Sequence, residues 1–275
     1  MKRRAGVIYS FRRPPPRRPP LRRLSSQRPA GTARAACNGP MPASTCYPLP
    51  MKTPAENRQQ HYRRLYRERH PNWRSSPALF RDLVSEKVTG DTRLLDVGCG
   101  STDFMKEVYS RTPHTYGVDP DARALARNPV LRHTVAATAE GLPFADGSFD
   151  LVTLAWVIEH LRTPEQAFRE IHRVLRPGGH MVFLTPNAWN YNVWLIRAVP
   201  NAAHDFFTRR LYHRSTDATF PTYYRLNSPQ RLDRTLTALG YERERLLLNG
   251  DPTYLAFGPA SFAAARALER LLDWR

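Results

Sequence analysis

The sequence has no long apolar run and few cysteines. No apolar stretch approaches the roughly 18 to 20 residues that a helix needs to cross a bilayer, which excludes an integral membrane protein built on such helices. The three cysteines, Cys37, Cys46 and Cys99, do not have the spacing of a metal site. The sequence therefore predicts a protein of a reducing, cytoplasmic compartment.

Acidic residues are missing from the first 50 positions. Residues 1–50 hold 11 of the 42 Lys and Arg, ten prolines and no Asp or Glu, which leaves 31 basic against 24 acidic residues, a net +7, for the rest. The overall charge of +18 is therefore weak evidence for a specific nucleic-acid partner. We expect residues 1–50 to be a disordered Arg/Pro-rich tail, and an alternative hypothesis places the true start at Met51.

The first informative motif is a glycine-containing loop between a predicted strand and a helix. Residues 94–97, Leu-Leu-Asp-Val, are typical of a short strand buried on both faces. Gly98 and Gly100 allow a sharp turn in which the backbone comes close to a ligand. A second apolar run ends at Asp119, twenty-one positions after Gly98, a spacing at which a carboxylate can accept hydrogen bonds from the hydroxyls of a ribose.

The same loop argues against a dinucleotide. The Gly-x-Gly-x-x-Gly motif requires glycine where Asp103 stands, and a carboxylate is unfavourable beside a pyrophosphate at the start of a helix. A nucleoside without phosphate fits better. Taken alone, the motif also fits a tight strand-to-helix turn that binds nothing.

Further motifs follow in order at regular separations. They are Ala-Glu-Gly-Leu-Pro-Phe at 139–144, Ser-Phe-Asp-Leu-Val at 148–152, Glu-His-Leu at 159–161 and Arg-Val-Leu-Arg-Pro-Gly-Gly at 173–179. With the glycine loop and Asp119, this ordered set resembles the class I S-adenosylmethionine-dependent methyltransferases, in the small-molecule branch with a type 11-like domain. The resemblance covers roughly residues 54–258.

The resemblance implies an α/β fold. We expect a Rossmann-like, mostly parallel sheet of seven strands with helices on both faces and the last strand antiparallel. From the sequence we expect that strand to belong to a hairpin of residues 241–248 and 252–257, since Asn249-Gly250-Asp251 between them is a strong turn signal. A helix at about 260–273 should end the chain.

The chain divides into five expected parts. After the tail, residues 51–92 should be helices that cover the cofactor, 93–187 the cofactor-binding core, 188–226 an aromatic-rich insertion before the sixth strand, and 227–275 the rest of the domain. Nine aromatic residues between 188 and 225 suggest a substrate lid. A satellite core covering the sheet, or a surface that rests on a membrane, are the alternatives.

The resemblance implies S-adenosylmethionine as the cofactor, with S-adenosylhomocysteine as its product and no metal. The family commonly has Asp at the position of Thr138, where it holds the adenine amino group, so the sequence departs there. A hydroxyl can still accept that hydrogen bond. The predicted cofactor-binding residues are Asp96, Gly98, Cys99, Gly100, Asp119, Pro120, Thr138, Ala139, Glu140, Ala155 and Trp156.

The acceptor side has a candidate base and a set of candidate contact residues. His160, just after the fourth predicted core strand, is the candidate base, with His204 in reserve; alternatively, His160 only ties the backbone of a loop. The predicted substrate residues are Tyr62, Asn187, Tyr191, Tyr223 and Tyr224, although Tyr62 also fits ordinary helix packing.

These features predict methyl transfer to a small-molecule, glycan or lipid-linked acceptor, with an oxygen of a sugar, lipid intermediate or quinone-like ring favoured. Possible partners are therefore such an acceptor and, peripherally, a membrane surface. Two other functions stay open: an RNA-modifying methyltransferase, suggested by the basic tail, and a cofactor-binding protein without catalysis.

Overall fold

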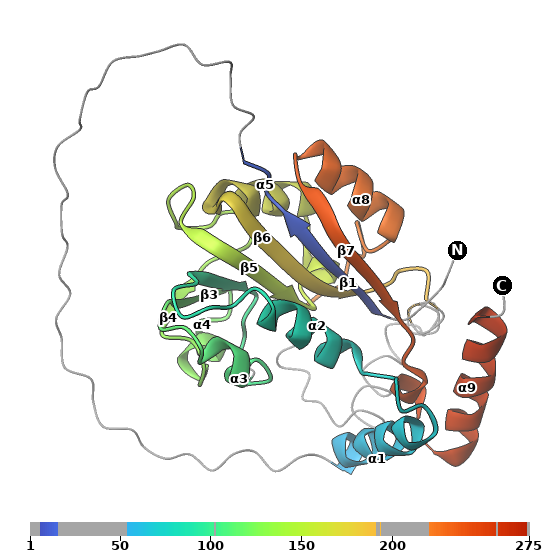
Figure 1. Cartoon of the computed structure of the whole chain (residues 1–275). Coiled ribbons are helices and arrows are strands. Elements are labelled where there is room, and N and C mark those ends of the chain that lie inside the picture. The colour runs from blue at the N-terminus through green and yellow to red at the C-terminus, as the bar shows by residue number, and fades with distance from the viewer. Residues whose placement is uncertain are drawn as a thin grey trace, which may run out of the picture.

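The computed structural model describes residues 6–15, 54–101, 103–190, 193, 220–256 and 258–273, and its centre is a sheet of seven strands (Figure 1). The strand order is β4-β3-β2-β5-β6-β1-β7. β2 to β6 pair in parallel, whereas β1 is antiparallel to both β6 and β7. The expected mostly parallel sheet of seven strands is confirmed. The strands are β1 Gly6–Arg12, β2 Leu94–Val97, β3 Thr115–Asp119, β4 His133–Ala136, β5 Phe149–Ala155, β6 Leu175–Pro186 and β7 Glu242–Asn249.

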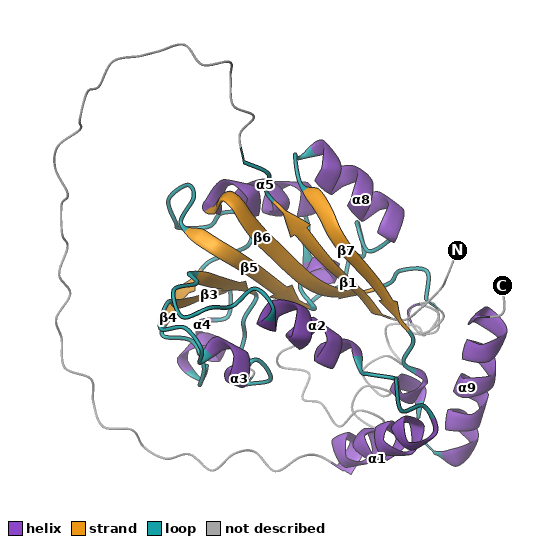
Figure 2. Cartoon of the chain, in the orientation of Figure 1, coloured by secondary structure: helices purple, strands orange, loops and turns teal. Residues whose placement is uncertain are grey.

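Helices cover both faces of the sheet (Figure 2). Apolar residues of α2 and α3 pack on one face, and those of α5 and α8 pack on the other. α1 and α9 lie beyond the carboxyl ends of the parallel strands (Figure 1). The helices are α1 Pro54–Arg69, α2 Ser76–Ser85, α3 Lys106–Tyr109, α4 Ala122–Ala126, α5 Pro164–Val174, α8 Pro229–Ala238 and α9 Pro259–Asp273, with short 3-10 helices η1 Ile158–His160 and η4 Pro252–Leu255.

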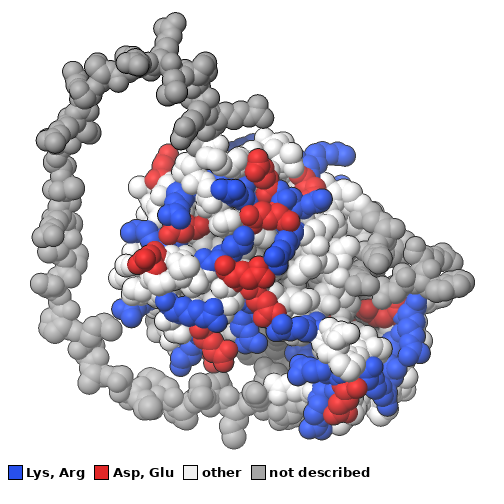
Figure 3. Space-filling view, in the orientation of Figure 1, with Lys and Arg blue, Asp and Glu red and all other residues white. Residues whose placement is uncertain are grey.

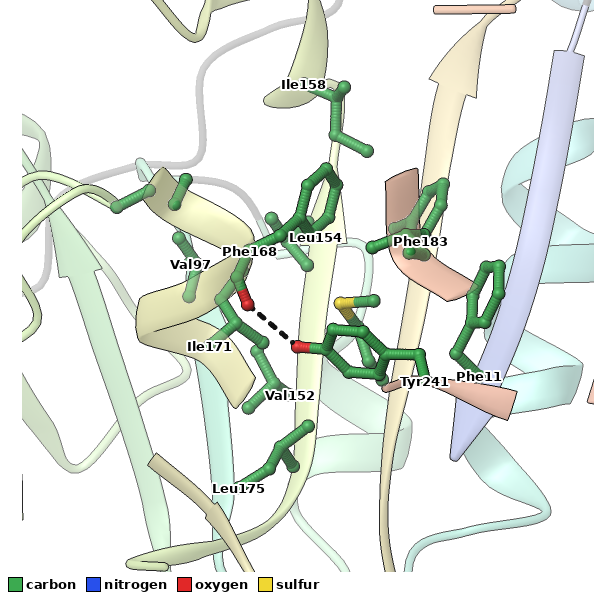
Figure 4. Packing of buried hydrophobic residues seen from close by; sticks show 14 of the residues in the cluster. Phe11, Val97, Val152, Leu154, Ile158, Phe168, Ile171, Leu175, Phe183 and Tyr241 are labelled. Atoms are coloured by element: carbon green, nitrogen blue, oxygen red, sulfur yellow. Dashed lines mark hydrogen bonds between the residues drawn. The ribbon is translucent and has the colours of Figure 1, made fainter. Parts of the chain in front are cut away.

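The larger half of the core lies between the sheet and α5 and α8. Phe11 of β1, Phe183 of β6 and Tyr241 meet there (Figure 4), with ring centroids of Phe11 6.0 and 6.2 Å from the other two. The Tyr241 hydroxyl donates a hydrogen bond to the Phe168 carbonyl at 3.1 Å. A buried hydroxyl is thus satisfied inside an otherwise apolar cluster.

The prediction of a disordered tail is wrong for residues 6–12. These residues form β1, in which Val7, Tyr9 and Phe11 face one core and Ile8 faces the other. All four side chains have no exposed surface. The prolines begin only at position 14, so the composition of the whole tail concealed a short run of β-branched and aromatic residues that is suited to a strand.

The expected carboxyl-terminal hairpin does not form either. β7 is present, but residues 252–255 form η4 and not a second strand. The Asp251 side chain accepts a hydrogen bond from the Thr253 amide at 3.0 Å, which favours a tight turn over an extended chain. The antiparallel strand of the sheet is therefore β1, and a chain that began at Met51 would leave β6 and β7 without it.

Most of the expected insertion, including Tyr191 and His204, lies outside the described residues. The two flanks of the insertion are held together where it leaves the sheet, because the Ala188 amide donates to the Asn227 carbonyl at 2.7 Å. Within the described ranges, no helix is both long and apolar enough to cross a membrane.

If β1 is part of the core in solution, Phe11→Ala should lower the free energy of unfolding by about 3–5 kcal/mol, because it leaves a cavity among packed rings. Urea denaturation measures this. Phe220→Ala removes the same atoms from a residue that is 46% exposed and should change stability by no more than about 0.5 kcal/mol. Equal, small effects of the two substitutions would show that residues 6–12 are not packed in the sheet.

Candidate active site

The loop after β2 has the geometry that its glycines predict. Gly98 and Gly100 have φ angles of +71° and +50°, a backbone region that other residues rarely adopt. A Cβ on Gly98 would collide with Val157. A Cβ on Gly100 would have nothing nearer than an Asp119 carboxylate oxygen at 4.0 Å, so this side of the loop is open.

Asp119, at the end of β3, faces this loop. One of its carboxylate oxygens accepts a hydrogen bond from the Gly100 amide and the other from the Asp121 amide, each at 2.9 Å. Each oxygen has a second lone pair that can accept from a ligand hydroxyl. The carboxylate is 7% exposed and is held by two backbone groups before any ligand arrives.

Gly117 of β3 leaves space for the Cys99 side chain of the loop after β2. A Cβ on Gly117 would meet Leu131 and would lie 2.7 Å from the Cys99 sulfur. Cys99 is buried, and burial, with smaller contributions from Asp96 and Asp119, raises the pKa of its thiol well above the usual value. Cys99 therefore supports the loop as a neutral thiol and is not a reactive nucleophile.

Asp96, the third residue of β2, begins a buried hydrogen-bond chain. The Thr153 hydroxyl donates to its carboxylate at 3.0 Å, and the Tyr109 hydroxyl lies 2.7 Å from the Thr153 hydroxyl. Burial raises the pKa of Asp96 to about 7; nearby Asp119 also raises it, whereas the hydrogen bonds from Thr153 and Tyr109 lower it. Asp96 therefore changes charge near neutral pH.

The chain turns sharply where β5 ends. Trp156 has a φ of +58° and is 42% exposed, and a bulky residue in this conformation is a genuine outlier. Its amide donates to the Leu184 carbonyl at 2.9 Å, and its ring lies 5.5 Å from that of Phe104. The strained turn holds an exposed indole at the carboxyl edge of the sheet, beside Ala155.

The segment after β4 supplies the other predicted cofactor residues. Thr138 is exposed, and its side chain has no hydrogen-bond partner among the described residues, so its hydroxyl is available. Ala139 is buried in the core. The Glu140 carboxylate accepts from the Thr163 hydroxyl at 3.4 Å, which ties this segment to the start of α5.

His160 lies in η1, on the acceptor side. Its Nδ1 is 2.9 Å from the Pro221 carbonyl oxygen. A carbonyl can only accept, so Nδ1 carries the proton and, in the neutral ring, Nε2 keeps a free lone pair. The ring therefore ties a loop, as one of the two interpretations expected, and the base role at Nε2 stays a prediction.

Sequence reasoning missed a buried polar chain next to His160. The Asn227 side-chain amide donates to the Thr185 hydroxyl at 2.5 Å, which donates to the Glu159 carboxylate at 3.0 Å. All three residues are at most 4% exposed. Burial raises the pKa of Glu159 to about 7, although hydrogen bonds from the backbone and Thr185 oppose this. The Glu-His-Leu motif at 159–161 was the available signal, but the sequence did not show that Glu159 pairs with Thr185 and Asn227.

The predicted substrate residues have different surroundings. The amides of Tyr223 and Tyr224 lie 2.7 and 3.3 Å from the Glu159 carbonyl, beside His160. Asn187 is buried and accepts from the Trp189 amide at 3.0 Å, so it shapes the chain after β6. Tyr62 packs against Phe262 of α9, with ring centroids 4.8 Å apart, as the packing alternative expected.

Basic and acidic side chains are interspersed on the face of the molecule shown in Figure 3. Among the described residues, several basic and acidic side chains form ion pairs, such as Arg243 with Asp233 and Arg245 with Glu86. A face of this kind differs from the continuous basic stripe of a nucleic-acid-binding surface.

Comparison with known proteins agrees with this geometry. Residues 95–183 match the family described as methyltransferase domain. An uncharacterized methyltransferase of Mycobacterium sp. strain KMS is 36% identical over 125 residues, 43% of this chain and 47% of the relative. The ubiquinone/menaquinone biosynthesis C-methyltransferase UbiE of Geotalea daltonii is 34% identical over 110 residues, 36% of this chain and 47% of the relative.

A demethylmenaquinone methyltransferase of Thermus thermophilus is 36% identical over 112 residues, 38% of this chain and 50% of the relative. The chain spans about half the length of these curated relatives. Among solved structures, an S-adenosylmethionine-dependent methyltransferase from Mesorhizobium loti has a TM-score of 0.46 and 21% identity, covering 71% of this chain and 91% of that one.

Residues 95–183 are thus similar to a methyltransferase domain, and the relatives that match part of the chain are named methyltransferases, as the motifs indicated.

Asp96 should make cofactor binding depend on pH. A positively charged cofactor favours the ionised carboxyl, so binding releases a proton and tightens as pH rises through about 7. Calorimetry with S-adenosylmethionine at about pH 6 and pH 8 should show up to about a tenfold gain in affinity, and buffers of different ionisation enthalpy report the released proton. Asp96→Asn should abolish this dependence; a dependence that persists in the variant would assign it to another group.

Proposed function

We propose that this protein transfers the methyl group of S-adenosylmethionine to a small-molecule or lipid-linked acceptor, at an oxygen atom. The observation that carries the cofactor part is the placement of Asp119 against the open side of the Gly98–Gly100 loop. This arrangement suits a ribose whose hydroxyls reach a carboxylate while the backbone passes close to the ligand.

The residues present fit the rest of this cofactor. Asp96 and Asp119 supply negative charge next to the loop, which complements a cation. The exposed Thr138 hydroxyl and the segment at Ala139 are the groups we propose for contact with the adenine. Asp103 follows the loop where a phosphate would otherwise sit, which supports a nucleoside without phosphate.

The chemistry asks little of the protein beyond positioning. When bound, S-adenosylmethionine supplies a methyl group that is already activated, because its leaving group is a neutral thioether. The chain's own residues then have to hold the acceptor in line with that methyl group and exclude water. If the acceptor is an alcohol, His160 Nε2 can accept its proton, while Nδ1 stays bonded to Pro221.

Exposed aromatic residues at the carboxyl edge support an acceptor with an apolar part. Trp156, Trp189 and Phe220 are 42, 49 and 46% exposed, and large exposed rings near a candidate site favour contact with apolar ligands. A second candidate acceptor atom is a ring carbon, because relatives of this chain are named as quinone C-methyltransferases.

The cofactor claim predicts a specific loss on changing Asp119. Asp119→Asn removes the charge and one acceptor, so the affinity for S-adenosylmethionine and S-adenosylhomocysteine should fall by about a hundredfold in calorimetry, or about 3 kcal/mol. Asp121→Asn makes the same charge change two positions away and keeps a residue that can cap α4; it should bind normally. Equal loss in both variants, or no binding by the wild type, would contradict the claim.

His160 separates catalysis from cofactor binding. A screen of sugars, hydroquinones and lipid phosphates with methyl-labelled cofactor identifies the acceptor, and RNA in the same screen tests the RNA alternative.

With an alcohol acceptor, His160→Gln should lower turnover by about 10² to 10⁴-fold while cofactor affinity is unchanged, since Gln can still donate to Pro221. His114→Gln, at an exposed position, is the control. Full turnover by His160→Gln would remove His160 as a base, and no turnover of any compound would favour a protein that binds the cofactor without catalysis.

A further inference from the structure

Three arginines beside the candidate base are not paired with acids. Arg162 comes shortly after η1, and Arg225 lies in the segment that leads into α8. Arg231 lies in the first turn of α8. None of them forms an ion pair with a carboxylate in the described part of the chain. Elsewhere Arg173, for example, is held by both Glu170 and Asp146.

Two of these arginines lie over one aromatic ring, and the third contacts the backbone of one of them. The guanidinium carbons of Arg162 and Arg225 lie 5.7 and 5.8 Å from the centroid of Tyr223. Arg162 Nε also donates to the Tyr223 hydroxyl at 2.8 Å, and Arg231 donates to the Arg225 carbonyl at 3.2 Å. Two positive charges thus lie at a single side chain, and a third arginine is bonded to the backbone of one of them, an arrangement that repulsion disfavours unless an anion joins them.

The segment that carries this cluster is held in a strained conformation. Tyr224, between Tyr223 and Arg225, has a φ of +50°, a genuine outlier for a bulky residue. Such strain persists only where surrounding contacts enforce it, and it is concentrated at functional sites. Here the enforcing contacts are the two hydrogen bonds from the amides of Tyr223 and Tyr224 to the Glu159 carbonyl.

The same contacts place the cluster next to His160. Tyr223 is bonded to the residue before His160, and Pro221 is bonded to the His160 ring at 2.9 Å. The Phe220 ring lies 6.3 Å from the His160 ring. An exposed aromatic ring, a candidate base and the two guanidinium groups at Tyr223 therefore lie close together.

We propose that Arg162, Arg225 and Arg231 bind a phosphate group of the methyl acceptor, while Phe220 contacts its apolar part. Guanidinium groups recognise phosphate through paired, charge-assisted hydrogen bonds, and three of them match a group of more than one negative charge. This inference rests on the proposed methyl transfer and names its substrate class as a phosphate-bearing amphiphile.

Pyrophosphate is the probe for this site. In calorimetry on the full chain saturated with S-adenosylhomocysteine, pyrophosphate should bind in the millimolar range or tighter, and Arg162→Gln and Arg225→Gln should each weaken binding by about tenfold. The double variant should bind at least about a hundredfold more weakly if the two contributions add. Arg169→Gln makes the same charge change at an exposed, unpaired arginine of α5 and should have no effect.

Vesicles distinguish the source of the phosphate. Binding to phosphatidylglycerol but not phosphatidylcholine vesicles, lost in the double variant, would indicate a lipid phosphate, and pyrophosphate binding alone would indicate a soluble phosphorylated acceptor. The proposal is overturned if neither probe binds, or if Arg169→Gln weakens binding as much as the other two variants. If the phosphate probes fail but S-adenosylhomocysteine binds normally, only the phosphate site is contradicted and the proposed methyl transfer stands. If the cofactor does not bind, the proposed methyl transfer itself is contradicted.

Discussion

The Asp119 carboxylate, held by two backbone amides, is the constraint on which the site depends. Those amides belong to the loop after β2 and to the turn after β3, so one side chain fixes the distance between two strand ends. The glycines permit the turn, but they do not hold it in place. Because the carboxylate oxygens of Asp119 are already aligned, they would accept hydrogen bonds from a ribose without moving. Binding would therefore cost little free energy for reorganisation of the site.

The sheet extends this rigidity to the acceptor side. β6 lies between β5 and β1, and its end carries Thr185, which is bonded to both Glu159 and Asn227. The position of the loop that holds His160 therefore depends on a strand held on both edges. β1, although remote in sequence from every site residue, stabilises this arrangement because six of its seven residues are buried.

Local motifs could be predicted from the sequence, and long-range pairings could not. The Gly98–Gly100 turn and the end of β3 at Asp119 follow from conformational limits that act within a few residues. Either residues 6–12 or residues 252–257 could have formed the antiparallel strand of the sheet. The hydrophobic periodicity of each segment does not show which of the two pairs with the neighbouring strands. The chain from Asn227 through Thr185 to Glu159 joins segments 42 and 26 positions apart, and each residue alone looks like an ordinary polar residue.

The candidate site has acidic side chains on one side and basic side chains on the other. Asp96 and Asp119 lie in β2 and β3, on the proposed cofactor side, whereas Arg162 and Arg225 lie over Tyr223, with Arg231 bonded to the Arg225 carbonyl, on the proposed acceptor side. A cationic cofactor and an anionic acceptor would each reduce an unbalanced field, and each would also attract the other. The affinity for either ligand should therefore rise when the other is bound, with no change of shape required, because complementary charges in a partly desolvated site interact more strongly than they do in water.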